Sequence, residues 1–205
     1  AMSAERPDRY DAPFRLGNLL REKERYKDAV AAYDQAIERI KNPGPEHWAV
    51  YYARGMALER DKQYARAEKD LMRALEYRPD QPFVLNYLAY MWIDQNENLE
   101  RARDMIKRAV ELRPEDGYIV DSMGWFHYRM GEYDQAVTML ERAVELRPSD
   151  PVINDHLGDA YWRVGRRDEA GFQWNRAMTF DPPKDVQDDI KIKLERGLTT
   201  SAKKG

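Results

Sequence analysis

Residues 151–182 decide the fold, because their sequence PVINDHLGDAYWRVGRRDEAGFQWNRAMTFDP carries the marks of a helix–turn–helix unit. Gly158 lies in the first half, Gly165 at the centre, Ala177 in the second half and Pro182 at the end. Small side chains let two antiparallel helices approach closely, and larger residues one turn away fill the space between them. Glycine suits the left-handed turn between the helices, and proline stops the second one. The stretch therefore predicts two short helices packed face to face.

The same pattern recurs along the chain. One column of small residues has spacings of 38, 34, 35 and 34, at Gly17, Gly55, Ala89, Gly124 and Gly158. Two alanine columns keep the same step, at Ala29, Ala67, Ala102, Ala136 and Ala170 and at Ala36, Ala74, Ala109, Ala143 and Ala177. Such registered columns indicate an internal repeat.

Other positions support the repeat. Large fillers fall midway between the two alanine columns, at Tyr33, Leu71, Ile106, Leu140 and Trp174. A further set precedes the small column, at Leu16, Arg54, Leu88, Met123 and Leu157. Arg54 is the departure in this set, and we expect its stem to pack while its charged head reaches water. The turn within each repeat is predicted at Glu24, Lys62, Asn96, Gly131 and Gly165.

The repeats form one predicted domain, residues 10–184. Their boundaries are predicted near 10–43, 48–81, 82–116, 117–150 and 151–184. After them Val186, Ile190, Leu194 and Leu198 recur every four residues, which predicts a capping helix at 185–198 with one apolar stripe. Residues 1–9 are interpreted as a tag remnant or flexible segment, and 199–205 as a disordered tail.

These columns resemble the tetratricopeptide repeat (TPR), a helix–turn–helix unit of about 34 residues. The resemblance implies an all-α fold, a right-handed superhelical solenoid of five TPR repeats plus a C-terminal capping helix. It also implies a scaffold that binds a peptide or protein segment in a concave groove lined by the first helix of each repeat. The stretch from Asp155 to Trp162 resembles bacterial members, many of which belong to the cell envelope. On that resemblance we favour the envelope or periplasm over the cytoplasm.

The groove should be lined by the side of each first helix that lies away from the small column. The predicted groove residues are Tyr52, Met56, Phe83, Asn86, Tyr90, Ile93, Tyr118, Asp121, Trp125, Tyr128, Asp155, Asp159 and Trp162. Aromatic rings are typical binding anchors. The row Asn86, Asp121 and Asp155 could hydrogen-bond an extended ligand or pair with its Lys or Arg side chains. We therefore expect a partner with apolar anchors and basic flanks.

Alternatives stay open at this point. The aromatic rings could pack between adjacent first helices, and the polar row could simply face water. The chain could also be a structural or self-assembling module, including a homo-oligomer, or an accessory subunit of a cell-envelope complex. A clamp for a terminal carboxylate is disfavoured, because only Arg15, Asn18 and Arg21 offer suitable groups.

Composition narrows the function further. The chain has 205 residues, 35% of them charged, with a formal net charge of -3 and no cysteine. Thiol chemistry is excluded, and nucleic-acid binding is not expected without a basic field. Membrane insertion is not expected either, because no apolar run approaches the roughly 20 residues of a membrane span. No nucleophile, base and orienting group can be assembled, so we predict no enzyme, no catalytic residues and no cofactor. Asp155, His156 and Asp159 are poor metal-site candidates, because His156 would be the single nitrogen ligand.

Overall fold

The computed structural model describes residues 10–198, and over this range the fold is all-α, with eleven α-helices and no strand. The chain divides into two compact units, described over residues 10–91 and 92–198, and the division falls within one helix. The interpretations of residues 1–9 and 199–205 lie outside the described residues. Each unit is built from helix pairs joined by short turns.

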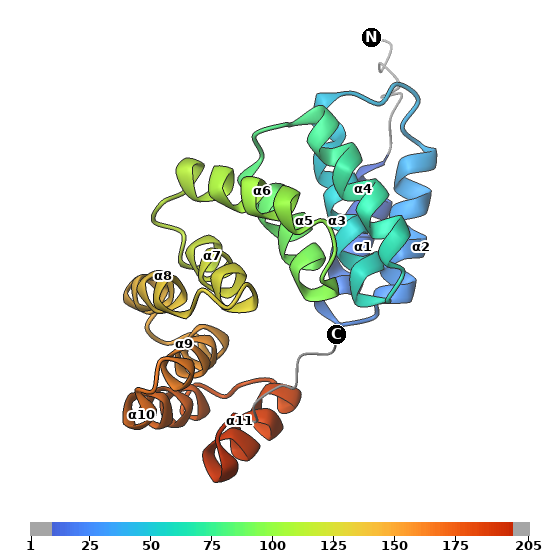
Figure 1. Ribbon diagram of the computed structural model, residues 1–205. Helices are drawn as coiled ribbons and strands as arrows, with labels where there is room; N and C mark the ends of the chain where they lie inside the picture. Colours follow the sequence, from blue (N-terminus) through green and yellow to red (C-terminus); the bar gives the residue numbers. More distant parts are fainter. Residues whose placement is uncertain (1–9, 199–205) are drawn as a thin grey trace. The chain divides into compact units, whose positions relative to one another are not determined.

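The N-terminal unit contains four complete helices and most of a fifth. Its helices are α1 (Asp11–Glu22), α2 (Tyr26–Glu38), α3 (Trp48–Arg60), α4 (Tyr64–Tyr77) and the first part of α5 (Pro82–Gln95), with a short 3-10 helix η1 (Pro45–His47) before α3. Figure 1 shows α1 to α4 side by side, each packed against its neighbour in sequence. Tyr33, Leu58 and Leu71 are fully buried at the centre of this unit.

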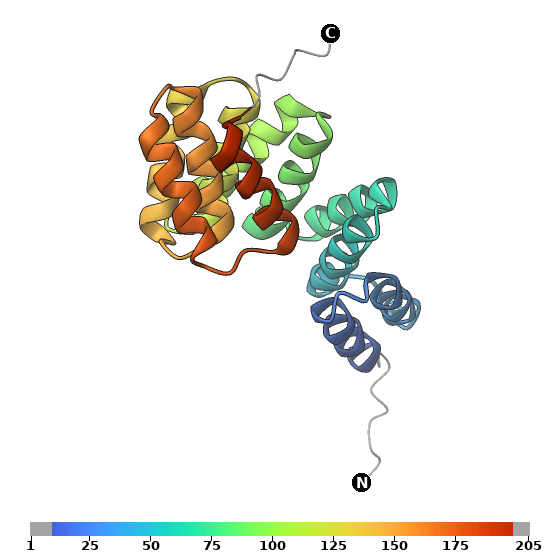
Figure 2. The ribbon, with the colours of Figure 1, turned by 90° about the horizontal axis from the view of Figure 1, so that it is seen from below.

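The C-terminal unit continues the alternation and ends on a single helix. Its helices are α6 (Leu99–Leu112), α7 (Gly117–Arg129), α8 (Tyr133–Leu146), α9 (Pro151–Arg163), α10 (Arg167–Met178) and α11 (Lys184–Arg196). Helix α11, dark red in Figure 2, packs against α9 and α10. Leu140, Leu157 and Trp174 belong to the buried cluster that joins these helices.

Close approach within the pairs confirms the predicted roles of the small and large columns. A Cβ atom added to Gly158 would lie 2.5 Å from Trp174, and one added to Gly124 would lie 2.6 Å from Leu140. Real Cβ atoms essentially never approach so closely. The missing side chain is therefore what lets the bulky partner fill the space between the two helices.

The turns also follow the predictions. All five predicted turn positions have left-handed backbone, with φ of 57° at Glu24, 62° at Lys62, 57° at Asn96, 76° at Gly131 and 84° at Gly165. Asp150 caps α9, because its carboxylate accepts hydrogen bonds from the backbone N–H groups of Val152 and Ile153. The left-handed residues thus mark the turn after each first helix, and Asp150 fixes the start of α9.

The expectation for Arg54 is wrong. Its guanidinium is held by carboxylates of the protein, because its Nε donates to Asp70 at 2.6 Å and one terminal nitrogen donates to Asp34 at 2.7 Å, and only 17% of the side chain is exposed. Asp34 lies on α2 and Asp70 on α4, so Arg54 on α3 links three helices of the N-terminal unit. A bidentate contact to the buried Asp70 replaces the apolar packing that the other repeats use here.

Helix α11 departs in part from its predicted stripe. Ile190 is fully buried and Leu198 packs on the core, but Leu194 is exposed and the buried position next to it is Lys193. Ile192 stands 34 positions after Gly158, where every earlier repeat has a small residue, and it is also exposed. Helix α11 therefore lacks the small residue over which the second helix of each described pair packs closely.

Candidate functional site

The predicted groove residues are divided between the two units. Tyr52, Met56, Phe83, Asn86 and Tyr90 belong to the N-terminal unit, and Ile93, Tyr118, Asp121, Trp125, Tyr128, Asp155, Asp159 and Trp162 belong to the C-terminal unit.

In the N-terminal unit the central ring, Tyr52, is engaged by neighbouring rings. It stacks on Trp48 with ring centroids 6.0 Å apart, and it meets Tyr87 of α5 edge-on at 6.0 Å. Burial raises the pKa of Tyr52 to about 12. The hydroxyl of Tyr87 in turn donates to Glu59 at 2.8 Å. Tyr52 therefore packs between first helices, which was one of the open interpretations.

Phe83 and Asn86 have different surroundings from Tyr52. Phe83, near the start of α5, is an exposed large apolar side chain. Asn86 is half-buried, and its side-chain oxygen is enclosed without a hydrogen-bond partner among the described residues. A buried acceptor that lacks a donor is uncommon in folded proteins.

In the C-terminal unit three rings form a continuous stack. Trp125 lies against Tyr128 with centroids 4.8 Å apart and an interplanar angle of 9°, and against His156 at 4.2 Å and 15°. Tyr128 is one helical turn after Trp125 on α7, whereas His156 comes from α9. Trp125 and Tyr128 keep part of their surface accessible. We call Trp125, Tyr128 and His156 the aromatic stack.

His156 is held in place by a buried carboxylate. Its Nδ1 lies 2.9 Å from Asp121 on α7, and both side chains are almost completely enclosed. Burial opposes a charge on the ring, but the carboxylates of Asp121, Asp155 and Asp159 outweigh it and raise the pKa of His156 above its usual value. Asp121 thus fixes the position of His156 within the aromatic stack.

Lys193 of α11 provides the matching contact one repeat further on. Its ammonium donates to Asp155 at 2.8 Å and to Asp159 at 3.0 Å, and it lies 2.8 Å from Asp189. Lys193 is only 7% exposed. Burial and the adjacent Asp155 carboxylate raise the pKa of Asp159 to about 6. Asp159 also accepts a hydrogen bond from the indole of Trp174 at 2.9 Å.

These contacts correct the picture of an open polar row. Asp121, Asp155 and Asp159 are buried, and each carboxylate pairs with a cation or imidazole from the next helix that packs beside it. Ile93 is also fully buried. None of these four residues presents a free surface to a ligand, because their polar or apolar groups are used within the protein.

Three arginines lie where α7 and α9 end and α10 begins, and we call them the arginine edge. Arg163 donates from Nε to the Tyr128 hydroxyl at 3.2 Å and stands 5.9 Å from the centroids of the Tyr128 and Tyr133 rings. Arg167 lies 5.0 Å from the centroid of the Trp162 ring. The third member is Arg129, which approaches Asp94 at 3.5 Å.

Trp162, the last predicted groove residue, is covered on one side by the end of α11. A Cβ atom added to Gly197 would lie 2.0 Å from its ring, and Trp162 also packs against Trp174 with centroids 5.5 Å apart. The Trp162 ring is partly accessible, and the Arg167 guanidinium lies over it. Trp162 is therefore a support for α11 and Arg167 more than an open surface.

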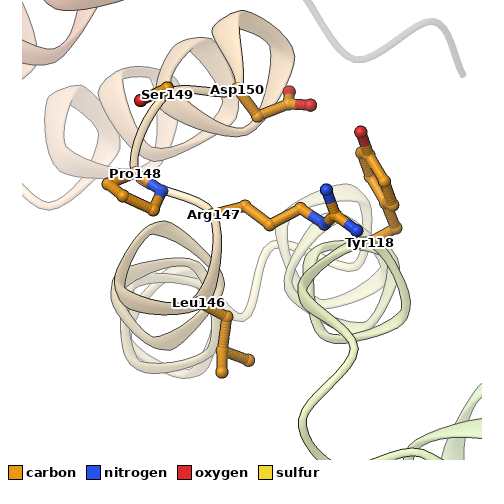
Figure 3. A pocket seen from close by; sticks show the side chains of 6 residues that line it. All are labelled: Tyr118, Leu146, Arg147, Pro148, Ser149 and Asp150. Carbon is orange, nitrogen blue, oxygen red and sulfur yellow. The ribbon is translucent and has the colours of Figure 1, made fainter.

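A shallow hollow of about 350 Å³ lies where α8 meets α9. Figure 3 shows Arg147, Asp150 and Tyr118 turned toward one another at its mouth. The Arg147 guanidinium stands 4.0 Å from the centroid of the Tyr118 ring. Because Asp150 is also the cap of α9, this arrangement has a clear structural role, although Tyr118 itself is 49% exposed.

Sequence reasoning missed the residues that complete this unit: His156, Lys193, Asp94 and the arginine edge. A signal for Lys193 was present, because it follows Asp159 by 34 positions and so falls in the register of the repeat. The arginines gave no such signal, since charged residues at helix ends are common on any solvated surface.

Two further findings bear on chemistry. Asp155 and Asp159 face Lys193 while His156 faces Asp121, and the described residues contain no group of three or more His, Asp or Glu side chains that could hold a metal ion. Within the same range no helix combines the length and apolar character needed to cross a membrane.

Comparison with family models identifies the repeat. A model described as "Tetratricopeptide repeat" matches residues 14–83 and 52–117, and a model described as "TPR repeat" matches residues 127–165. A TPR repeat-containing protein of Pseudomonas aeruginosa, PA4667, is 35% identical over 102 residues, which is 50% of this chain but 17% of that protein. The match thus spans about a sixth of the relative's length.

Solved structures show the same fold. TTC0263, a thermophilic TPR protein of Thermus thermophilus, superposes with a TM-score of 0.76 at 23% identity, over 91% of this chain and 99% of that one. MamA of Desulfovibrio magneticus RS-1 gives 0.67 at 18% identity, over 90% and 99%. YrrB, described as a TPR protein with an unusual peptide-binding site, gives 0.60 at 20%, over 88% and 90%. The chain belongs to the tetratricopeptide repeat family, whose repeats are generally protein–protein interaction modules.

Proposed function

We propose that this chain is a non-enzymatic scaffold that binds a segment of another protein on its first helices, with Trp125 as the principal apolar anchor. The observation that carries the proposal is the aromatic stack. A tryptophan held between two flat rings is rigid, so it loses little conformational freedom on binding, and part of its surface stays open.

The family supports a general role in protein binding, and the geometry supports the first helices as the binding surface. TPR repeats generally bind proteins, and one structural neighbour, YrrB, is described as having a peptide-binding site. Phe83 and Tyr118 lie at the starts of α5 and α7 and are exposed, as expected of secondary apolar contacts. We therefore still expect a partner with apolar anchors. Its basic flanks lose their support, because the aspartates that suggested them are buried and paired.

A display library of random peptides tests this function. We expect peptides selected on the parent chain to bind Trp125→Ala at least tenfold more weakly, which corresponds to about 1.4 kcal/mol. Phe172→Ala is the matched control, because Phe172 is 63% exposed but lies on α10, a second helix. Circular dichroism should show that both variants keep the parent's helix content. Equal binding by Trp125→Ala and the parent would refute the proposal.

A second candidate function, self-association, has one observation in its favour. Leu16 and Leu19 on α1 are 49% and 48% exposed, whereas Leu88 and Leu157, which occupy the column of Leu16 in later repeats, are buried. An exposed apolar pair on one helix face is a common feature of protein interfaces. Light scattering over a range of concentrations would detect a dimer in the parent that Leu16→Glu abolishes. A monomer at every concentration would exclude this function.

A further inference from the structure

We propose that the arginine edge (Arg129, Arg163 and Arg167) binds the acidic side chains of the partner, so that the segment held at Trp125 is rich in Asp and Glu. This inference rests on the proposed function, since Trp125 supplies the apolar anchor. The charge proposed for the partner is opposite to the one expected from the sequence, which indicated basic flanks.

Two of these cations, Arg163 and Arg167, form no ion pair among the described residues. Arg129 reaches Asp94 only at 3.5 Å. Arg166, beside them, is different. It donates to Glu169 at 3.0 Å and to Glu141 at 3.1 Å.

Aromatic rings hold two of these arginines in place. Arg163 is fixed by the Tyr128 hydroxyl and lies near two tyrosine rings, and Arg167 lies against Trp162. A guanidinium on an aromatic face keeps donors free for a planar, bidentate contact with a carboxylate. Because the side chain is already ordered, binding costs less conformational entropy.

Three nearby acids are buried and paired within the protein. Asp155 and Asp159 are paired with Lys193, and Asp121 with His156. Asp94 is the exception, but it is shared between Arg129 and the Trp125 indole at 3.4 Å, and burial raises its pKa. Among the described residues, the partly exposed carboxylate that contacts the arginine edge is Asp94, so three cations stand beside one acid, which favours acidic ligands and disfavours basic ones.

Geometry connects the edge to the anchor. Tyr128 stacks on Trp125 with one face and receives Arg163 on its hydroxyl, so anchor and cation are separated by a single ring. A segment with an apolar residue on Trp125 would place a side chain a few residues away within reach of Arg163 or Arg129. An acidic residue at that spacing satisfies both contacts.

The experiment selects peptides from a random display library on four versions of the full chain. These are the parent, Arg163→Gln with Arg167→Gln, Arg166→Gln as the matched control, and Trp125→Ala. We expect Asp and Glu to be enriched near an apolar residue on the parent, and the enrichment to disappear on the double variant. A peptide selected on the parent should bind the double variant about tenfold more weakly and Arg166→Gln less than twofold more weakly. Its affinity for the parent should fall as ionic strength rises.

Several outcomes would overturn the inference. They are selected peptides without acidic enrichment, enrichment that survives in the double variant, and a loss in Arg166→Gln as large as in the double variant. Competition by inorganic phosphate or an oligodeoxynucleotide as strong as by the acidic peptide would show a general anion patch and also overturn it. Peptides that depend on Trp125 but lack acids would leave the proposed function intact. Acidic peptides that ignore Trp125 would refute the anchor and, with it, this account of the partner.

Discussion

Lys193 on α11 and Asp155 on α9 form a buried ion pair, with the ammonium 2.8 Å from one carboxylate oxygen and 2.9 Å from the other. One repeat earlier, His156 on α9 reaches Asp121 on α7 at 2.9 Å. In both cases a carboxylate on one first helix accepts from a nitrogen on the next helix that packs beside it. Helix α11 therefore docks in the way that α9 does, although no second helix follows it among the described residues.

Removal of the lysine charge should loosen α11. In Lys193→Met the side chain keeps similar bulk, but Asp155 and Asp159 are left buried without their cation. Breaking one side of a buried pair typically costs about 3 kcal/mol or more. We expect a loss of this size in urea unfolding, with faster hydrogen exchange in α11. Lys191→Met is the control, because Lys191 forms an exposed contact with Asp188 and should change stability by less than about 0.5 kcal/mol. Similar unfolding curves for the two variants would contradict the docking role of Lys193.

The contact between His156 and Asp121 makes stability depend on pH. A histidine whose folded pKa exceeds its unfolded value near 6.5 stabilises the fold fully below that value and loses this contribution as pH rises through the folded pKa. The NMR titration of the His156 ring should have a midpoint above 6.5. Asp121→Asn should lower this midpoint, because the substitution removes a carboxylate that offsets the effect of burial on the charged ring. Asp134→Asn, which removes an exposed charge from α8, should leave it unchanged. The stability difference between the parent and Asp121→Asn should be larger at pH 6 than at pH 8.5; the opposite order would disprove this linkage.

Much of the fold could be predicted from the sequence, because its determinants are local and repeat. Gly158 and Trp174 belong to one helix pair, and the left-handed turn at Gly165 lies between them. Each repeat packs two helices in the same way, so the columns of small residues and of large residues appear in register. Residue type and spacing then suffice to place the helices.

The candidate site was less predictable, because its contacts join different repeats. Asp121 and Asp155 look like exposed acids when each helix is considered alone. Their partners, His156 and Lys193, are 35 and 38 residues away, and only the packing of adjacent helices brings them together. Arg54 was misjudged for the same reason, since Asp34 and Asp70 come from two other helices. Pairing across helices decides which charges stay free for a partner, and that cannot be inferred from one helix face.

Two glycine substitutions should have opposite effects. Gly158→Ala would place a methyl group 2.5 Å from the Trp174 indole, including the nitrogen that donates to Asp159, so we expect a loss of about 1–3 kcal/mol. Gly171 lies within α10 with no atom within 4 Å of an added Cβ. Gly171→Ala should therefore raise stability by about 0.5–1 kcal/mol, because alanine is the better helix former. Thermal unfolding of both variants, compared with the parent, shows whether each substitution lowers or raises stability. A gain for Gly158→Ala would refute the close-packing account.

Arg54 and Asp70 should be strongly coupled. Arg54→Leu restores the residue type found at this column in the first, third and fifth repeats, yet it leaves Asp70 buried without its cation, so we expect a loss of about 3 kcal/mol. Asp70 occupies the position of Met139 in the fourth repeat, where Met123 occupies the column of Arg54. The double variant Arg54→Leu with Asp70→Met should therefore recover most of the loss, because two apolar side chains replace the ion pair.

Hydrogen exchange of the backbone amides in residues 10–91 reports the stability of the N-terminal unit in a double-mutant cycle of these variants. We expect a coupling energy of about 2 kcal/mol, above the few tenths typical of independent sites. Asp34→Ala serves as the control, because Asp34 is more exposed than Asp70 and meets Arg54 through one nitrogen only. Its loss should be smaller than that of Asp70→Ala. Additive effects in the Arg54 and Asp70 cycle would show that Arg54 stabilises the three helices through its aliphatic stem and not through the buried carboxylate.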